Sequence, residues 1–205
     1  MISPLAYVNP KAKIGKDVTI HPFAYIDENV EIGDNCTIMP YASILSGTHM
    51  GNNNMVYQAA IIGATPQDFQ FKGDETFVEI GNDNVIREKA IINRATFKGN
   101  STTVGNGNFI LEGVHVAHDT QIGNFCILGN GTKTAGNCTL DDKAILGSGV
   151  ILKHGCHVGG WTLSGMVVEQ IKTYLHILSL LIIQSVIMES MLFFYQRKEI
   201  FLMTF

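Results

Sequence analysis

Residues 114–119, with the sequence Val-His-Val-Ala-His-Asp, combine the side chains that acid–base chemistry needs. Because an imidazole titrates near neutral pH, His118 could take a proton from a hydroxyl group as a general base. Asp119 follows directly and could orient that ring, although neighbours on a strand usually point to opposite sides. What else reaches this segment depends on the elements that hold it.

An apolar residue recurs at every sixth position along most of the chain. The series runs unbroken from Val8 to Ile62, resumes at Ile80 and continues to Val158, with breaks at Lys98 and Thr134. A period of six fits neither a helix nor a long strand, but it is typical of short strands that turn a corner and repeat. Three hexads make one coil of about 18 residues, and coils stack about 4.8 Å apart. The sequence therefore predicts an all-β solenoid, with Gly and Asn supplying positive φ at its corners.

The two apolar series are separated by a segment in which the sixth-position residues are Asp68 and Asp74. We therefore expect an inserted loop at about residues 64–77 within a solenoid domain of residues 1–165. The coil length also predicts a column, because residues 18 apart lie one above another. His118, Gly136 and His154 share such a column, and a glycine between two histidines leaves room for a substrate and exposes an N–H that could hold an oxyanion.

Composition limits the function further. Only 16% of the 205 residues are charged and the net charge is -4, so no basic field for nucleic acid is expected. The start of the chain has no basic segment followed by an apolar core, and the four cysteines form no C-x-x-C pair. We therefore expect no signal peptide, free thiols and a cytoplasmic protein.

Three strings are similar to those of the UDP-N-acetylglucosamine O-acyltransferases of lipid A biosynthesis. They are GVHVAHD at 113–119, INRAT at 92–96 and PQDFQFKGDETFVEIGNDNVIRE at 66–88, and the resemblance covers roughly residues 1–165. It implies a left-handed parallel β-helix, a hand that the six-residue period does not give. It also implies a homotrimer with its clefts between subunits, no metal and no cofactor, with the acyl group arriving as a thioester of acyl carrier protein.

The resemblance assigns roles to residues of this chain. His118 would take the proton from the sugar 3-hydroxyl as that hydroxyl attacks a β-hydroxyacyl thioester, Asp119 would orient it, and the Gly136 N–H would face the acyl carbonyl. The implied substrate-binding residues, for UDP-N-acetylglucosamine, are Gln67, Asp68, His115, Asn137 and His154. The family often has Lys where this chain has Gln70, His where it has Asn137, and Gln where it has Gly155, which bears on nucleotide contacts more than on catalysis.

The hexads end at Gly165, and residues 166–205 form an apolar segment without that period. We expect this tail to be helical or disordered, and not a stable membrane anchor because its stretch from Leu175 to Tyr195 carries several polar residues. Synonymous codons for the tail can be chosen so that another reading frame gives a sequence similar to the family's own continuation. We therefore hypothesise a frameshift near Gly165, which would replace the family's helical domain.

Three alternatives remain open from the sequence. The chain could be a zinc-dependent γ-type carbonic anhydrase, which needs three converging imidazoles, or another hexapeptide acyltransferase. It could also be a non-functional truncated copy or a non-enzymatic trimeric scaffold. Neither the acyl chain length nor the activity of the chain as written follows from the sequence.

Overall fold

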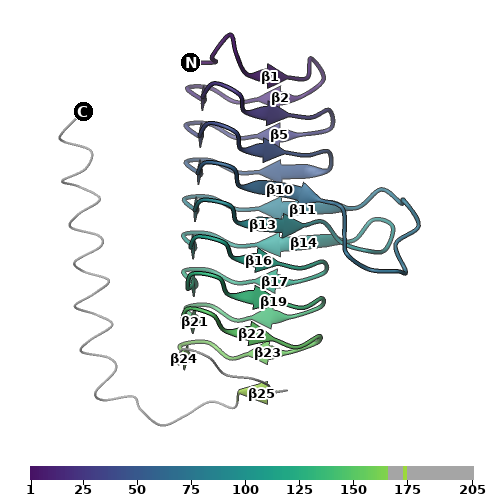
Figure 1. Ribbon diagram of the computed structural model, residues 1–205, viewed down its shortest axis with the longest axis vertical. Helices are drawn as coiled ribbons and strands as arrows, with labels where there is room; N and C mark the ends of the chain where they lie inside the picture. Colours follow the sequence, from purple (N-terminus) through teal and green to yellow (C-terminus); the bar gives the residue numbers. More distant parts are fainter. Residues whose placement is uncertain (166–172, 175–205) are drawn as a thin grey trace, which may run out of the picture. The chain divides into compact units, whose positions relative to one another are not determined.

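The computed structural model describes residues 1–165 and 173–174, which form a stack of coils running from β1 at one end to β24 and β25 at the other (Figure 1). Each regular coil contributes one short strand to each of three parallel sheets. The first sheet contains β1 (Tyr7–Val8), β4 (Tyr25–Ile26), β7 (Ser43–Ile44), β10 (Ile61–Ala64), β13 (Ile91–Asn93), β16 (His115–Val116), β19 (Lys133–Thr134) and β22 (Ile151–Leu152).

The other two sheets repeat this order. The second contains β2 (Lys13–Ile14), β5 (Glu31–Ile32), β8 (Thr48–Met50), β11 (Phe77–Ile80), β14 (Ser101–Val104), β17 (Gln121–Ile122), β20 (Thr139–Leu140), β23 (His157–Val158) and β25 (Thr173–Tyr174). The third contains β3 (Thr19–Ile20), β6 (Thr37–Ile38), β9 (Met55–Val56), β12 (Val85–Ile86), β15 (Phe109–Ile110), β18 (Ile127–Leu128), β21 (Ile145–Leu146) and β24 (Leu163–Ser164). The predicted all-β solenoid is confirmed.

The residues of the six-residue series form the core. They pair in register with their equivalents one coil away, as Ile26 does with Val8 and Ile44, and most of them are buried. Burial of stacked aliphatic side chains is the main stabilising contribution of each added coil. Buried polar residues are paired in the same way: the Asn84 side chain donates to Asn54 Oδ1 at 3.0 Å, and Asn84 Oδ1 accepts the Asn108 N–H at 2.9 Å.

Glycines serve two purposes at the corners, and the expectation that they supply positive φ holds for only some of them. Gly113 and Gly131 do adopt positive φ, as do the asparagines at positions such as Asn35. Most glycines directly after the apolar position do not, with Gly63 as an exception. A Cβ on Gly51 would lie 2.8 Å from the Gly81 carbonyl oxygen of the next coil, so these glycines are needed for the close approach of stacked corners.

Two insertions lengthen the coils on one side. Residues 65–76, between β10 and β11, and residues 94–100, between β13 and β14, project together (Figure 1). Because of them, Ile62 pairs with Ile92, and Ile92 pairs with Val116, rather than with residues 18 positions later. The two insertions contact each other, since the Gly99 N–H donates to the Glu75 carbonyl at 2.9 Å.

The sequence after Gly165 contributes one described element. β25 pairs in parallel with β23, so the second sheet extends into the segment for which no strand was expected. The exposed edge of β23 offers main-chain groups that such a strand can satisfy. Our predictions for the tail otherwise lie outside the described residues. Within residues 1–165 and 173–174, no helix is long and apolar enough to cross a membrane.

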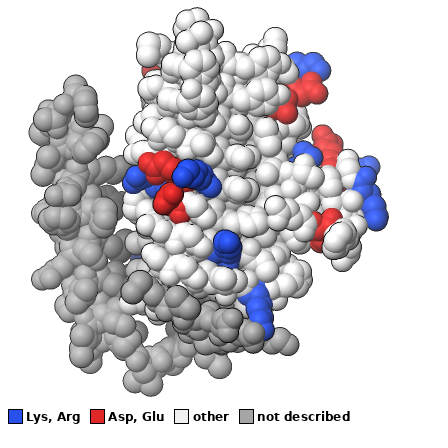
Figure 2. Space-filling model, in the orientation of Figure 1, with Lys and Arg blue, Asp and Glu red and all other residues white. Residues whose placement is uncertain are grey.

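The described surface is sparsely charged. On the face shown in Figure 2, Lys, Arg, Asp and Glu side chains are scattered, and positive and negative groups lie next to one another. Charged side chains also pair across adjacent coils, as Lys11 does with Glu28 at 2.7 Å. This face offers no broad positive patch of the kind that binds nucleic acid.

Candidate active site

A cleft of about 450 Å³ opens where the first insertion passes the corner that follows β16, β19 and β22. It is lined by Gln67, Asp68, Phe69, Gln70, His115, Ala117, His118, Thr134, Ala135, Gly136 and His154. The wall formed by the coils follows from strand register, because β16, β19 and β22 are successive neighbours in the first sheet. His118, Gly136 and His154 each stand two residues beyond the end of one of these strands, so the structure brings all three to this wall.

Gly136 leaves the space that the His118 ring occupies. A Cβ at position 136 would lie 2.5 Å from His118 Nε2 and 2.9 Å from Nδ1, well inside ordinary contact. Gly136 does not have positive φ, so its backbone conformation suits any residue. The glycine is therefore required here by the imidazole in front of it.

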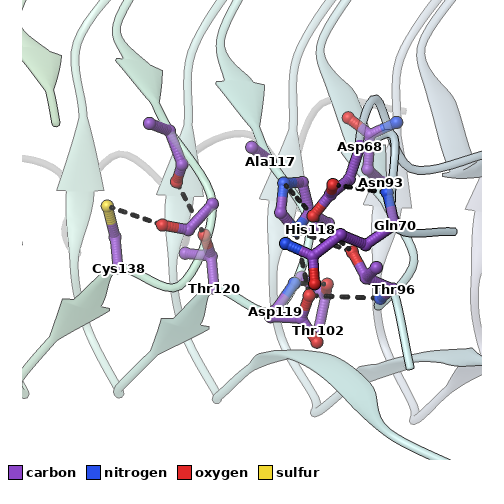
Figure 3. Close-up of polar contacts among 12 residues, drawn as sticks. Asp68, Gln70, Asn93, Thr96, Thr102, Ala117, His118, Asp119, Thr120 and Cys138 are labelled. Carbon is purple, nitrogen blue, oxygen red and sulfur yellow. Dashed lines mark hydrogen bonds and ion pairs between the residues drawn. The ribbon is translucent and has the colours of Figure 1, made fainter. Parts of the chain in front are cut away.

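Two oxygen atoms approach His118 Nδ1. Asp119 Oδ2 and Thr96 Oγ1 both lie 2.9 Å from it (Figure 3). Asp119 has φ of 57°, which turns the chain at the corner and brings its carboxylate beside the His118 ring, where strand neighbours would point apart. The carboxylate is fixed in turn, because its Oδ2 accepts the Thr96 N–H at 3.1 Å.

This arrangement selects one tautomer of His118. An ionised carboxylate only accepts hydrogen bonds, so Nδ1 carries the proton that faces Asp119 Oδ2. Nε2 then has a free lone pair in the neutral ring. The nearest charged group to Nε2 is the Asp68 carboxylate, whose Oδ2 is 3.7 Å away.

Asp68 is held in place by main-chain and side-chain donors. Its Oδ1 accepts the Gln70 N–H at 2.9 Å, which stabilises the turn of the first insertion. Its Oδ2 lies 3.5 Å from Thr96 Oγ1, so both insertions meet at this carboxylate. Gln67, just before it, is exposed on the cleft side.

His115 is a second imidazole of the cleft with a defined tautomer. The Asn93 amide nitrogen donates to the Thr65 carbonyl at 2.7 Å, so Asn93 Oδ1 must accept from His115 Nε2, 2.6 Å away. Burial lowers the pKa of His115, and the nearby Lys133 and His118 lower it further. His115 is therefore neutral at physiological pH.

Some expected residues lie elsewhere, and some important ones were not expected. Asn137 is exposed and is not among the residues that line the cleft, although its N–H donates to the His118 carbonyl at 2.9 Å. Thr96 and Asn93, which orient the two histidines, were assigned no role from the sequence. The signal for both was present, because they belong to the INRAT string that carries the family resemblance.

The described residues contain no ready-made metal site. Within residues 1–165 and 173–174, no group of three or more His, Cys, Asp or Glu side chains is placed to hold a metal ion.

Known proteins resemble this chain in sequence and structure. The bacterial transferase hexapeptide family (six repeats) matches residues 29–64 and 101–136. The solved structure of a UDP-N-acetylglucosamine acyltransferase from Bacteroides fragilis is 51% identical, covers 85% of this chain and 69% of its own, and superposes with a TM-score of 0.79. This chain belongs to the UDP-N-acetylglucosamine acyltransferase family. The Francisella novicida member is 38% identical, with a TM-score of 0.74 and coverage of 82% and 67%.

The family settles the fold, and the chain is a left-handed parallel β-helix, as predicted. A curated relative from Pseudomonas fluorescens, named acyl-[acyl-carrier-protein]–UDP-N-acetylglucosamine O-acyltransferase, is 44% identical over 167 residues. That match covers 81% of this chain and 65% of the relative, so the chain spans slightly less than two thirds of the curated family member.

Proposed function

We propose that this chain transfers a β-hydroxyacyl group from acyl carrier protein to the 3-hydroxyl of UDP-N-acetylglucosamine, with His118 as the general base. The observation that carries this proposal is the His118–Asp119–Thr96 arrangement beside Gly136 at the wall of a cleft. Family membership supports the substrates, because the names of the relatives state them. The reaction needs no metal or cofactor beyond the thioester.

The hydrogen bonds of His118 favour the tautomer that a base requires. With Nδ1–H facing Asp119, Nε2 takes the proton of the sugar 3-hydroxyl as its oxygen attacks the thioester carbon. The imidazolium that forms is stabilised by the Asp119 carboxylate 2.9 Å from Nδ1. The proton then passes to the departing thiolate, so that His118 is regenerated and the ester and the free thiol are the products.

Gly136 supplies the second part of the chemistry. Its N–H stands at the cleft wall next to the base, where the thioester carbonyl oxygen becomes negative during attack. A main-chain donor fixed in this position stabilises the oxyanion without reorganisation. Base and oxyanion donor follow neighbouring strands, β16 and β19, of the first sheet.

The loop of the first insertion would hold the sugar. Asp68 and Gln67 offer an acceptor and an amide on the side of the cleft opposite Gly136, and glucosamine presents hydroxyl and amide groups that match them. His115 and His154 would line the path to the nucleotide. Asn137 lies outside the cleft within one chain, so its proposed nucleotide contact depends on a partner subunit.

We further propose that the working form is a cytoplasmic homotrimer that docks acyl carrier protein. Phe69, beside Asp68 in the first insertion, is fully exposed at 103%, which suits a side chain that contacts another copy. A trimer would have a mass of about three times 22.4 kDa, which light scattering measures directly.

The test compares transfer from β-hydroxyacyl–acyl carrier proteins of several chain lengths to UDP-N-acetylglucosamine. The variants are His118→Gln and His157→Gln, and the latter removes an imidazole that pairs with Asp141 at 2.9 Å outside the cleft. We expect His118→Gln to lose about 10²- to 10⁴-fold in kcat and His157→Gln to keep wild-type activity. No transfer by the wild-type chain, with or without sugar binding, would favour the scaffold alternative, and an active His118→Gln would exclude the proposed base.

A further inference from the structure

Thr134 interrupts the apolar core of the first sheet at the cleft. Thr134 is only 3% exposed, so its hydroxyl is enclosed in the solenoid. The other inward positions of this sheet, one in each coil, are all aliphatic: Val8, Ile26, Ile44, Ile62, Ile92, Val116 and Leu152. A buried hydroxyl at such a position is costly unless it has a hydrogen-bonding function.

The hydroxyl of Thr134 takes over a main-chain hydrogen bond. The Ala117 N–H donates to Thr134 Oγ1 at 2.9 Å. In other coils the equivalent N–H donates to a carbonyl of the next coil, as from Asn9 to Ile26 and from Ala135 to Leu152, both at 2.9 Å. The pairing of β16 with β19 is correspondingly reduced to His115 with Lys133, whereas β19 pairs with β22 at both positions.

Because the Ala117 N–H bonds to the Thr134 hydroxyl, the Thr134 carbonyl oxygen lacks the main-chain donor that the equivalent carbonyl has in other coils. Thr134 lines the cleft although its side chain points into the core, so its main chain is the part that faces the cleft. A buried carbonyl that lacks a donor costs about 1–3 kcal/mol unless water or a ligand supplies one. This carbonyl is two residues from Gly136, on the same strand edge as the Gly136 N–H.

We propose that Thr134 is a positioning residue, whose hydroxyl frees its own carbonyl to accept a hydrogen bond from the acyl donor. The inference rests on the proposed function, because the Gly136 N–H must hold the thioester carbonyl for the acyl donor to lie along this edge. The ligand group is an N–H or O–H donor close to the thioester. Two such donors exist in the substrate: the β-hydroxyl of the acyl chain and the nearest amide N–H of the carrier's pantetheine arm.

Valine at position 134 separates this role from packing. Thr134→Val keeps the shape of the side chain and removes the hydroxyl, so the Ala117 N–H is expected to return to the Thr134 carbonyl. Thr134→Ser keeps the hydroxyl. Thr132→Val is the matched control, because it removes a buried hydroxyl two residues earlier, bonded to the Gly147 carbonyl at 3.0 Å, outside the cleft.

The first readout is a crystal structure of unliganded Thr134→Val, which requires no activity. A hydrogen bond from the Ala117 N–H to the Thr134 carbonyl in this variant supports the inference. Continued absence of that bond overturns it. The second readout is KM. Thr134→Val should raise KM for the acyl donor about 10-fold, the loss of one hydrogen bond, with kcat and the KM for UDP-N-acetylglucosamine unchanged. Thr134→Ser should restore the wild-type KM.

Two acyl donors of equal length, with and without the β-hydroxyl, identify the bonded group. A KM increase confined to the hydroxylated donor indicates the hydroxyl, and an equal increase for both indicates the amide. Unchanged KM values in Thr134→Val overturn the inference, as does a melting temperature far below that of Thr132→Val, because the hydroxyl would then be structural. A wild-type chain that transfers no acyl group refutes the proposed function instead. The crystal structure of Thr134→Val then still tests whether the hydroxyl displaces the Ala117–Thr134 main-chain hydrogen bond.

Discussion

Replacing Gly136 by alanine should disable the site while leaving the fold intact. The new Cβ would lie 2.5 Å from His118 Nε2, where carbon and nitrogen need at least about 3.4 Å, so the ring must move by about 1 Å. The alanine backbone itself is unstrained, because Gly136 does not have positive φ. All of the effect therefore comes from displacement of the imidazole.

The magnitude follows from where the ring can go. A base displaced by about 1 Å from its productive position costs about 10²-fold in rate. The movement also lengthens the 2.9 Å contact of Nδ1 with Asp119. Because the ring borders an open cleft, it can move outward, and the free energy of unfolding should fall by no more than about 1 kcal/mol.

The assay is kcat for acyl transfer together with thermal unfolding of Gly136→Ala and Gly165→Ala. Gly165 is the matched control, since an added Cβ there meets nothing within 4 Å and its φ is not positive. We expect kcat to fall about 10²-fold only for Gly136→Ala, with similar melting temperatures for both variants. Activity within twofold of wild type in Gly136→Ala would refute the placement of His118 against position 136.

Three further predictions concern the residues that support the site and the core. Thr96→Val should lower kcat about 10-fold without unfolding, and Thr96→Ser should retain activity; equal activity of both would remove Thr96 from the orientation of His118. Asn84→Ala should lower the free energy of unfolding in urea by about 1–3 kcal/mol, because the Asn108 N–H and the Gly105 carbonyl lose their hydrogen-bond partner. A smaller change would mean that water replaces the Asn84 side chain. His115→Gln should lose less stability than wild type between about pH 7 and about pH 5; equal losses would contradict the lowered pKa.

The sign of the pH prediction follows from the lowered pKa of His115. Above its usual value near 6.5 the ring is neutral in both folded and unfolded chains and contributes no pH dependence. As the pH falls below that value, the unfolded chain binds a proton that the folded chain does not, so the wild type loses stability. Glutamine cannot titrate, yet its amide can still donate to Asn93 Oδ1.

The six-residue period was sufficient to predict the sheets, the core and the corner column, because each coil repeats the same geometry. The six-residue period did not reveal the second insertion. Ile92 and Val116 are 24 residues apart, one hexad more than a regular coil, so the apolar series stays in phase across the insertion. In the sequence Lys98 therefore reads as a break in the apolar series, whereas it lies in a loop that leaves the solenoid.

The contacts of Thr96 and Asn93 with the two histidines could not be predicted from the repeat for the same reason. His118 contacts Thr96, and His115 contacts Asn93, at a separation of 22 residues in both cases. No multiple of six or eighteen gives that separation, because it depends on the length and path of the second insertion. The orientation of Asp119 depends on a positive φ, which a residue type does not reveal.

The departures from the repeat converge on the cleft. The first insertion, recognised from Asp68 and Asp74, supplies the carboxylate that faces His118 Nε2. The second, containing Lys98, carries Thr96 to His118 Nδ1, and Thr134 opens the ladder next to Gly136. A regular solenoid presents equivalent residues in every coil, whereas a reaction needs a base, an acceptor and a donor that differ. Positions that break the repeat are therefore where chemistry should be sought in proteins of this architecture. Among them, Thr134 places a polar side chain in the core, where packing alone favours an aliphatic one.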